Sequence, residues 1–203
     1  MTRPDVVVVR TGVANLASVV AGLNRAGAAV CISADPEEIL LAGRVVLPGV
    51  GAFGPAMEGL RRNGLDLALN SRCADGKALL AICLGLHLLA DGSEETPGVA
   101  GLGAIPGVAR RFTGAVRAPQ LGWNRVEPED GCALLTGGFA TFANSYRLET
   151  APEGFHAAFA DHGGRFVAGL ERGSLLACQF HPELSGSWGL ALLQRWLRAG
   201  ETC

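Results

Sequence analysis

The chain has 203 residues, 49% of them hydrophobic and 18% charged, so it is long enough for a sizeable core and disorder is excluded. Its 17 basic and 19 acidic side chains nearly balance, and no basic stripe indicates a nucleic-acid partner. The apolar run at residues 6–9 is too short for a signal sequence or a membrane span, so we expect a cytoplasmic protein.

The first half of the chain alternates short apolar runs with stretches of helical periodicity. Strands are predicted at residues 5–9, 28–33, 44–47 and 77–82. Helices are predicted at residues 15–26, 35–42, 55–63, 65–75 and 84–90, the first of them ending at Gly27 as its C′ residue. Continuous apolar strands between helices predict a parallel sheet that is covered on both faces.

Glycine and proline become frequent at residues 92–107, and the runs that follow are shorter. Strands are predicted at residues 108–112, 123–126, 141–145, 166–170 and 175–179, which indicates a turn-rich, partly antiparallel second half. Residues 185–197 are predicted to form an amphipathic helix. Because there is no internal repeat and no long linker, we expect residues 1–203 to form a single domain.

The six cysteines form no CxxC pair and show no metal-ligand spacing. We expect reduced thiols, most of them small core residues, and we expect neither a metal nor an organic cofactor. Cys83 differs because it lies where a predicted buried strand meets a predicted helix, with Gly85 two residues later. This arrangement is typical of a nucleophile elbow, in which the helix N-terminus favours a thiolate. A buried core cysteine is the alternative.

A second chemical feature is the sequence Phe-His-Pro-Glu at the end of the last predicted strand. Residues two apart on an extended segment point the same way, so His181 and Glu183 are predicted to face one site. A carboxylate beside an imidazole orients the ring and favours its charged form. A surface turn with a solvated glutamate is an equally simple interpretation of these residues alone.

A third feature is the glycine-rich loop Leu-Pro-Gly-Val-Gly-Ala-Phe-Gly at residues 47–54, directly after a predicted strand. Its glycines permit unusual backbone angles and close approach to a ligand, at the end of the sheet where α/β proteins bind ligands. The loop lacks the lysine of a phosphate-binding P-loop, so it does not predict nucleotide binding.

Together, the loop at 47–54, Ile-Cys-Leu-Gly at 82–85 and Phe-His-Pro-Glu at 180–183 resemble the triad-type, class I glutamine amidotransferases. More narrowly, these segments and Pro-Gln-Leu-Gly-Trp-Asn at 119–124 resemble the glutaminase subunits of imidazole glycerol phosphate synthases. The resemblance runs almost end to end. It implies a flavodoxin-like α/β fold with a mostly parallel central sheet.

The resemblance also implies a mechanism and its residues. Cys83 attacks the side-chain carbonyl of L-glutamine, His181 transfers the proton, and Glu183 holds the imidazole. The amides of Leu84 and Val50 form the oxyanion hole, and the loop at residues 48–51, which carries Val50, is expected to flip before the hole is complete. The implied substrate-binding residues are Gly49, Gly51, His87, Asn144, Ser145 and Tyr146.

The implied partner is a (β/α)₈ cyclase subunit, which receives the released ammonia and forms a heterodimer with the chain. The segments that match the family's interface contribute Asn15, Pro119, Gln120, Trp123 and Asn124. A core or rim position is the alternative for Trp123.

Four positions depart from the family's common pattern: Arg10, Ala81, His87 and Leu184. His87 stands where a glutamine is usual, and Leu184 stands where a lysine or arginine is usual. These departures keep two other interpretations open. One is a glutaminase for a different acceptor, in sugar or secondary metabolism, and the other is a non-catalytic regulatory subunit.

Overall fold

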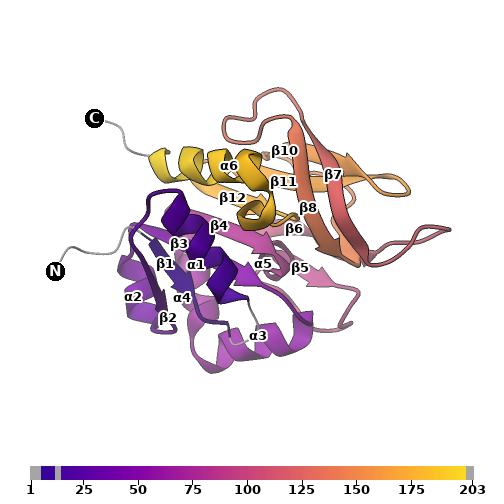
Figure 1. Ribbon diagram of the computed structural model, residues 1–203. Helices are drawn as coiled ribbons and strands as arrows, with labels where there is room; N and C mark the ends of the chain where they lie inside the picture. Colours follow the sequence, from indigo (N-terminus) through magenta and orange to yellow (C-terminus); the bar gives the residue numbers. More distant parts are fainter. Residues whose placement is uncertain (1–5, 12–14, 200–203) are drawn as a thin grey trace.

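A nine-stranded sheet runs through the part of the chain that the computed structural model describes, residues 6–11 and 15–199 (Figure 1). Its strand order is β2-β1-β3-β4-β12-β11-β10-β7-β8. Pairings from β2 to β12 are parallel, and pairings from β12 to β8 are antiparallel. The strands are β1 (Val6–Val9), β2 (Val30–Ser33), β3 (Arg44–Gly49), β4 (Ala78–Cys83), β7 (Gln120–Pro128), β8 (Gly138–Asn144), β10 (His156–Asp161), β11 (Arg165–Arg172) and β12 (Leu175–Cys178).

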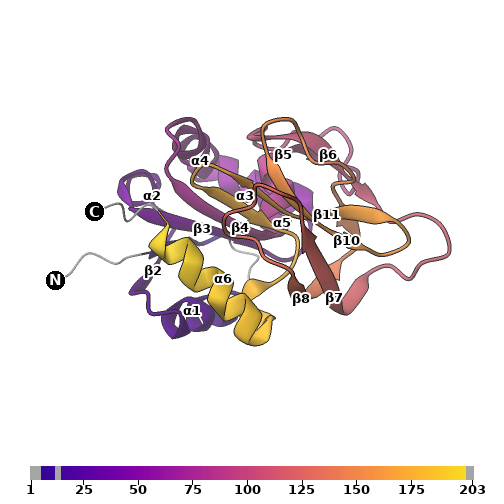
Figure 2. The same ribbon diagram turned by 90° about the horizontal axis from the view of Figure 1, so that it is seen from above.

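Helices cover both faces of the parallel half, as Figure 2 shows from above. One face carries α1 (Leu16–Arg25) and α6 (Gly186–Arg198), and the other carries α2 (Pro36–Leu41), α3 (Phe53–Arg62), α4 (Leu65–Ala74) and α5 (Leu84–Leu89). The four valines of β1 alternate between the two layers: Val7 and Val9 pack with α2–α5, and Val6 and Val8 pack with α1 and α6. The continuous apolar strand is thus explained by burial on both sides.

The antiparallel half of the nine-stranded sheet continues from β12. A second, three-stranded sheet, β5 (Ala90–Ser93), β6 (Ile105–Arg111) and β9 (Tyr146–Arg147), continues from the end of α5. No helix among the described residues is long and apolar enough to cross a membrane.

The predicted architecture is confirmed, including the change from parallel to antiparallel pairing. Gly27 directly follows Ala26, the C-cap residue of α1. Its φ is 102°, as expected for a glycine at the predicted C′ position. The strands β5, β9 and β10 were not predicted. The Asp-Gly pair in β5 favours a turn and β10 is rich in alanine, so pairing with neighbouring strands, rather than local propensity, decides both.

A buried carboxylate on β11 anchors the loop between β7 and β8. Glu171 accepts hydrogen bonds from the backbone N–H groups of Ala133, Leu134 and Leu135. We expect Glu171→Gln to lower the free energy of unfolding by about 1–3 kcal/mol, because these N–H groups lose a charged acceptor. Urea denaturation measures the change.

The matched control is Glu127→Gln, which removes the carboxylate of an exposed ion pair. Its expected effect is within about 0.5 kcal/mol. Equal losses in the two variants would show that the buried carboxylate contributes no more than a surface one.

Candidate active site

Cys83 lies where β4 meets α5, in a backbone conformation that few residues other than glycine adopt. Its φ is 53° and its ψ is −109°, and no other non-glycine residue in the described part of the chain has a positive φ. A strained residue between a buried strand and a helix is the geometry of a nucleophile elbow. The sequence predicted this turn from the cysteine and the glycine that follows it.

Close backbone packing holds the elbow against the end of β3. A Cβ atom on Gly85 would lie 2.1 Å from the backbone oxygen of Leu47, and a Cβ atom on Gly49 would lie 2.7 Å from the Cβ of Leu84. Only glycine fits at either position without displacing the backbone. The glycine-rich loop therefore begins directly beside the nucleophile.

His181 and Glu183 meet through a different local structure from the one predicted. β12 ends at Cys178, and residues 182–184 form a single turn of 3₁₀ helix, η1 (Pro182–Leu184), so the prediction of an extended segment is wrong. The turn still brings Nδ1 of His181 to 2.9 Å from Oε1 of Glu183, and both side chains are buried. The Ser185 hydroxyl donates a hydrogen bond to the backbone oxygen of His181 and stabilises the turn.

The electrostatics of His181 suit a thiolate partner. Burial alone disfavours the charged imidazole, but hydrogen bonding to Cys83 and to Glu183 outweighs it and raises the pKa of His181 to about 10. The ring is therefore an imidazolium at neutral pH, between a carboxylate and a sulfur atom. This is the charge distribution of a cysteine–histidine nucleophile.

This pKa gives the fold a pH-dependent contribution. The pKa of His181 in the fold, about 10, exceeds the value of about 6.5 for a free imidazole. The charged pair of His181 and Glu183 therefore stabilises the fold fully below about pH 6.5, and this stabilisation is lost as the pH rises through 10. We expect Glu183→Gln to lower the Tm by about 4–8 °C at pH 7. The deficit should shrink toward pH 10 in calorimetry of both proteins. A deficit that stayed constant from pH 7 to 10 would contradict a charged pair.

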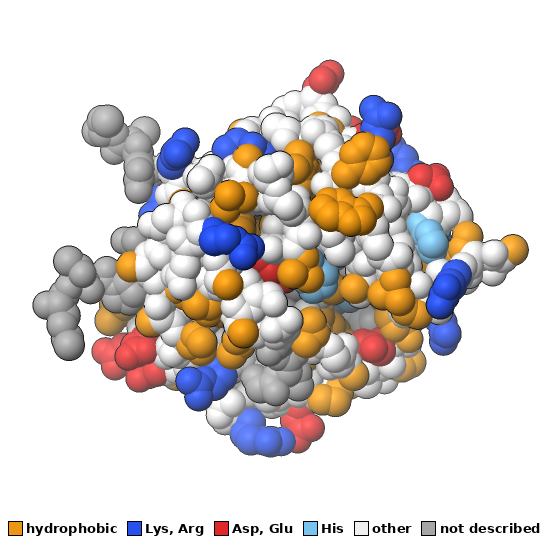
Figure 3. All heavy atoms as spheres, in the orientation of Figure 1, with side chains coloured by type: hydrophobic (Ala, Val, Ile, Leu, Met, Phe, Trp, Pro, Cys, Tyr) orange, Lys and Arg blue, Asp and Glu red, His pale blue; other side chains and the backbone are white. Residues whose placement is uncertain are grey.

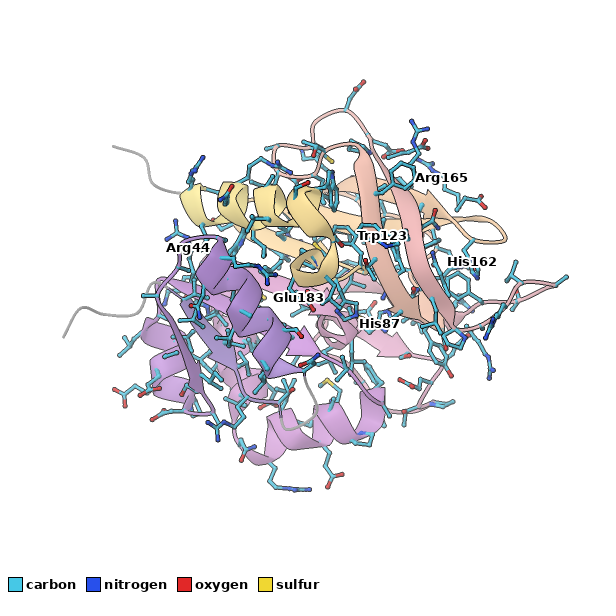
Figure 4. All side chains as sticks on the ribbon, viewed as in Figure 1. Arg44, His87, Trp123, His162, Arg165 and Glu183 are labelled. Atoms are coloured by element: carbon cyan, nitrogen blue, oxygen red, sulfur yellow. The ribbon has the colours of Figure 1, made fainter. Side chains whose placement is uncertain are left out.

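A cleft of about 290 Å³ opens in front of Cys83 and His181. Figure 4 shows the labelled side chains of His87 and Glu183 at the centre of the molecule, where the two halves of the sheet meet. The predicted residues that line the cleft are Val50, Gly51, Leu84, His87, Asn144, Ser145 and Tyr146. Gly49 does not line it but lies beneath, against the elbow.

Two wall residues were not predicted, Glu95 and Ala143. Oε2 of Glu95 accepts a hydrogen bond of 2.8 Å from the backbone N–H of Phe53, at the start of α3. A carboxylate at a helix N-terminus is held in a favourable field. The available signal was an acidic pair inside a glycine- and proline-rich stretch, which is equally typical of a solvated loop.

His87 is buried, and its environment keeps it uncharged. Burial lowers the pKa of His87 to about 4, against the opposing effect of its hydrogen bond to Gln179. The Nε2 atom of His87 lies 2.7 Å from Oε1 of Gln179. No local pattern indicates this contact, because the two residues are 92 positions apart.

Across the described residues, no group of three or more His, Cys, Asp and Glu side chains is arranged to hold a metal ion. The cleft is lined by a cysteine and an imidazole, with a carboxylate hydrogen-bonded to the imidazole. Together they can form and break a thioester.

Residues 10–198 match the family model for the class I glutamine amidotransferases. The chain belongs to this family. This amidotransferase is 42% identical over 187 residues to the imidazole glycerol phosphate synthase subunit HisH of Streptococcus gordonii, a match that covers 90% of each chain. It is 38% identical over 193 residues to the chloroplastic imidazole glycerol phosphate synthase hisHF of Arabidopsis thaliana, covering 92% of the amidotransferase and 33% of that relative.

A crystal structure described as a glutamine amidotransferase superposes on the chain with a TM-score of 0.78. The superposition covers 97% of the amidotransferase and 99% of that chain, at 21% sequence identity, and so confirms the fold. The predicted resemblance to the family is confirmed as well. The amidotransferase is accordingly a glutamine-hydrolysing enzyme.

The residues predicted for the partner interface fall into two groups. Pro119, Gln120, Trp123 and Asn124 come together at the start of β7, around a second cavity of about 380 Å³. Asn15 caps α1 through Oδ1, which accepts from the N–H of Ser18. Residues 12–14, which belong to the same matched segment, lie outside the described residues.

The side chains in the first group differ in what they can offer a partner. Trp123 is 61% exposed, but Gln120 is buried, and Nδ2 of Asn124 donates to the backbone oxygen of Asp161. Trp123 therefore presents its ring outward, whereas the side-chain amide of Asn124 joins β7 to the end of β10.

Proposed function

We propose that this amidotransferase is the glutaminase subunit of an imidazole glycerol phosphate synthase. It would hydrolyse L-glutamine and pass the ammonia to a separate (β/α)₈ cyclase in histidine biosynthesis. The observation that carries the proposal is that a strained Cys83 and His181 line one cleft, with Glu183 hydrogen-bonded to the ring of His181. The names of the relatives supply the enzyme, imidazole glycerol phosphate synthase.

The proposed reaction begins with attack of the Cys83 sulfur on the side-chain carbonyl of glutamine. A carbon–sulfur bond forms, and the negative oxygen is stabilised by the N–H groups of Leu84 and Val50. His181 donates its proton to the nitrogen, the carbon–nitrogen bond breaks, and ammonia leaves. A water molecule, deprotonated by His181, then attacks the thioester and releases glutamate.

The cleft suits a single amino acid. We propose that the backbone of residues 144–146 binds the head group of glutamine, together with Glu95, whose carboxylate can pair with the substrate's ammonium. The neutral imidazole of His87 faces the same space without adding a charge.

A face for the cyclase lies beside the cleft. Leu121 and Trp123 of β7 and Phe139 of β8 are each more than half exposed, and Leu184 is 46% exposed. Register pairs Trp123 with Thr141, whose hydroxyl donates to the backbone oxygen of Leu184, so β7, β8 and η1 form one surface. Figure 3 shows hydrophobic side chains over this hairpin on the face of the molecule that it draws. Exposed apolar groups that gather in this way indicate a protein partner.

The test is glutamate release from glutamine, measured for the chain alone and with the cyclase from the same genome, with and without the cyclase's phosphoribulosyl-formimino ligand. The expected result is weak activity that rises at least about 100-fold with the liganded cyclase, a change of roughly 3 kcal/mol in transition-state stabilisation. No stimulation by this cyclase would reject the assigned partner. Failure of a glutamine-analogue electrophile to label Cys83 would reject glutaminase activity itself.

Trp123→Ala tests the proposed surface. We expect the dissociation constant for the cyclase to rise about 10- to 100-fold, because a large exposed aromatic side chain at the centre of an interface often supplies much of the binding energy. Calorimetric titration measures it. The matched control, Leu67→Ala, truncates a leucine of α4 that is 72% exposed on the opposite face, and it should change the constant less than about twofold. Equal effects would contradict a cyclase site on the hairpin.

A further inference from the structure

A buried polar side chain reaches the nucleophile from behind the cleft. Gln179 follows β12, is fully buried, and has its Nε2 atom 3.9 Å from the sulfur of Cys83. Its side chain does not line the cleft, so it has no direct contact with the space that a substrate would fill. Its other amide atom, Oε1, lies 2.7 Å from Nε2 of His87.

We propose that Gln179 is a positioning residue for the Cys83 nucleophile, and that His87 fixes the Gln179 amide so that its N–H donates to the sulfur. This inference deepens the proposed function and rests on it for the reaction that Cys83 performs. It also assigns a role to the histidine that stands where the family commonly has glutamine.

The chemistry of the two groups selects this orientation. A thiolate can only accept hydrogen bonds, so an amide that supports it must turn its N–H toward the sulfur and its oxygen away. The oxygen then needs a donor, and the neutral imidazole of His87 supplies one through Nε2. Both side chains are buried, and an unpaired amide there would be costly.

The uncharged thiol has a different partner. The sulfur lies 3.9 Å from the backbone oxygen of Ala143, which can accept the S–H proton. When that proton is lost, the contact with Ala143 loses its donor and the contact with Gln179 gains a charge. The amide therefore favours the thiolate over the thiol.

Several titratable groups surround the Cys83 sulfur, so an informative variant must remove none of their charges. They are His181 and Glu183 at η1, Glu95 after β5, His87 on α5 and Tyr146 on β9. A change at Gln179 removes none of these side chains. A shift in the ionisation of Cys83 in a Gln179 variant would then report the lost N–H, rather than a lost charge.

The experiment measures the pH dependence of Cys83 alkylation by iodoacetamide in the full chain, following the Cys83 peptide by mass spectrometry. For Gln179→Met, which keeps the length of the side chain but removes its amide, we expect the midpoint to rise by about one pH unit, a tenfold change in the ionisation constant. We expect kcat for glutamine hydrolysis to fall about 3- to 10-fold, with KM changed less than about twofold.

Two further variants test His87 as the residue that orients the amide. His87→Leu should raise the alkylation midpoint in the same direction, and the double variant with Gln179→Met should be no worse than Gln179→Met alone. His87→Gln keeps an N–H donor for Oε1 of Gln179, so its alkylation midpoint should equal that of the wild type. Thermal melting of each variant confirms that the chain is folded.

An unchanged midpoint in folded Gln179→Met would overturn the proposal, and so would additive effects of the two single variants. Alkylation needs neither glutamine nor the cyclase. Wild-type protein that does not hydrolyse glutamine even with the liganded cyclase would therefore refute the proposed function, while the shift in the midpoint would still decide whether Gln179 positions the sulfur.

Discussion

Replacing the nucleophile should abolish glutamine hydrolysis. We expect Cys83→Ala to lower the rate of glutamate release by about 10⁴-fold or more, in the presence of the liganded cyclase, because no other thiol lines the described cleft. The free energy of unfolding should change little, since alanine is apolar and fits a site that is 7% exposed.

The control for this variant is Cys178→Ala, five residues before Glu183. Cys178 is also buried, and burial raises the pKa of its thiol well above the ordinary value, so it remains a thiol. Its replacement should leave at least about a third of the activity. More than about 1% residual activity in Cys83→Ala would mean that another group can act as the nucleophile.

The second large effect is expected at Gly85. A methyl group there would meet the backbone oxygen of Leu47 at 2.1 Å, far inside contact distance, and neither the strand nor the helix can move without opening the core. We expect Gly85→Ala to lower the free energy of unfolding by about 2–4 kcal/mol and to reduce activity by at least about tenfold. Chemical denaturation and the glutaminase assay measure the two effects.

Gly43→Ala is the matched control, because a Cβ atom at Gly43 meets no atom within 4 Å. This change should leave the free energy of unfolding within about 0.5 kcal/mol of the wild type and should not reduce activity. A Gly85→Ala protein as stable and as active as the Gly43→Ala protein would show that the elbow tolerates a side chain.

Much of the architecture could be predicted from the sequence, because local patterns encode it. Continuous valines in β1 require burial on both faces, and helical periodicity between such runs requires helices to cover them. The elbow was equally local, since a strand, a cysteine and Gly85 follow one another within a few residues. These features depend on neighbours along the chain, which a sequence displays directly.

The pairing of His181 with Glu183 was predicted for the wrong physical reason. Extended backbone was expected at residues 181–183, whereas Pro182 begins a 3₁₀ turn. Two side chains at this spacing can meet in either geometry, so the residues were right although the local structure was not. The residue types and their spacing carried the prediction.

The sequence by itself determined the fold class and singled out Cys83, His181 and Glu183 as candidate catalytic residues, since each follows from a contiguous pattern. Only the tertiary structure decided that Glu95 reaches the cleft and that Gln179 stands between His87 and Cys83. The reason is that contacts between side chains distant in sequence depend on how β4, β12 and α5 pack. Burial then gives those contacts their effect, because an amide or an imidazole removed from water must find a partner within the protein.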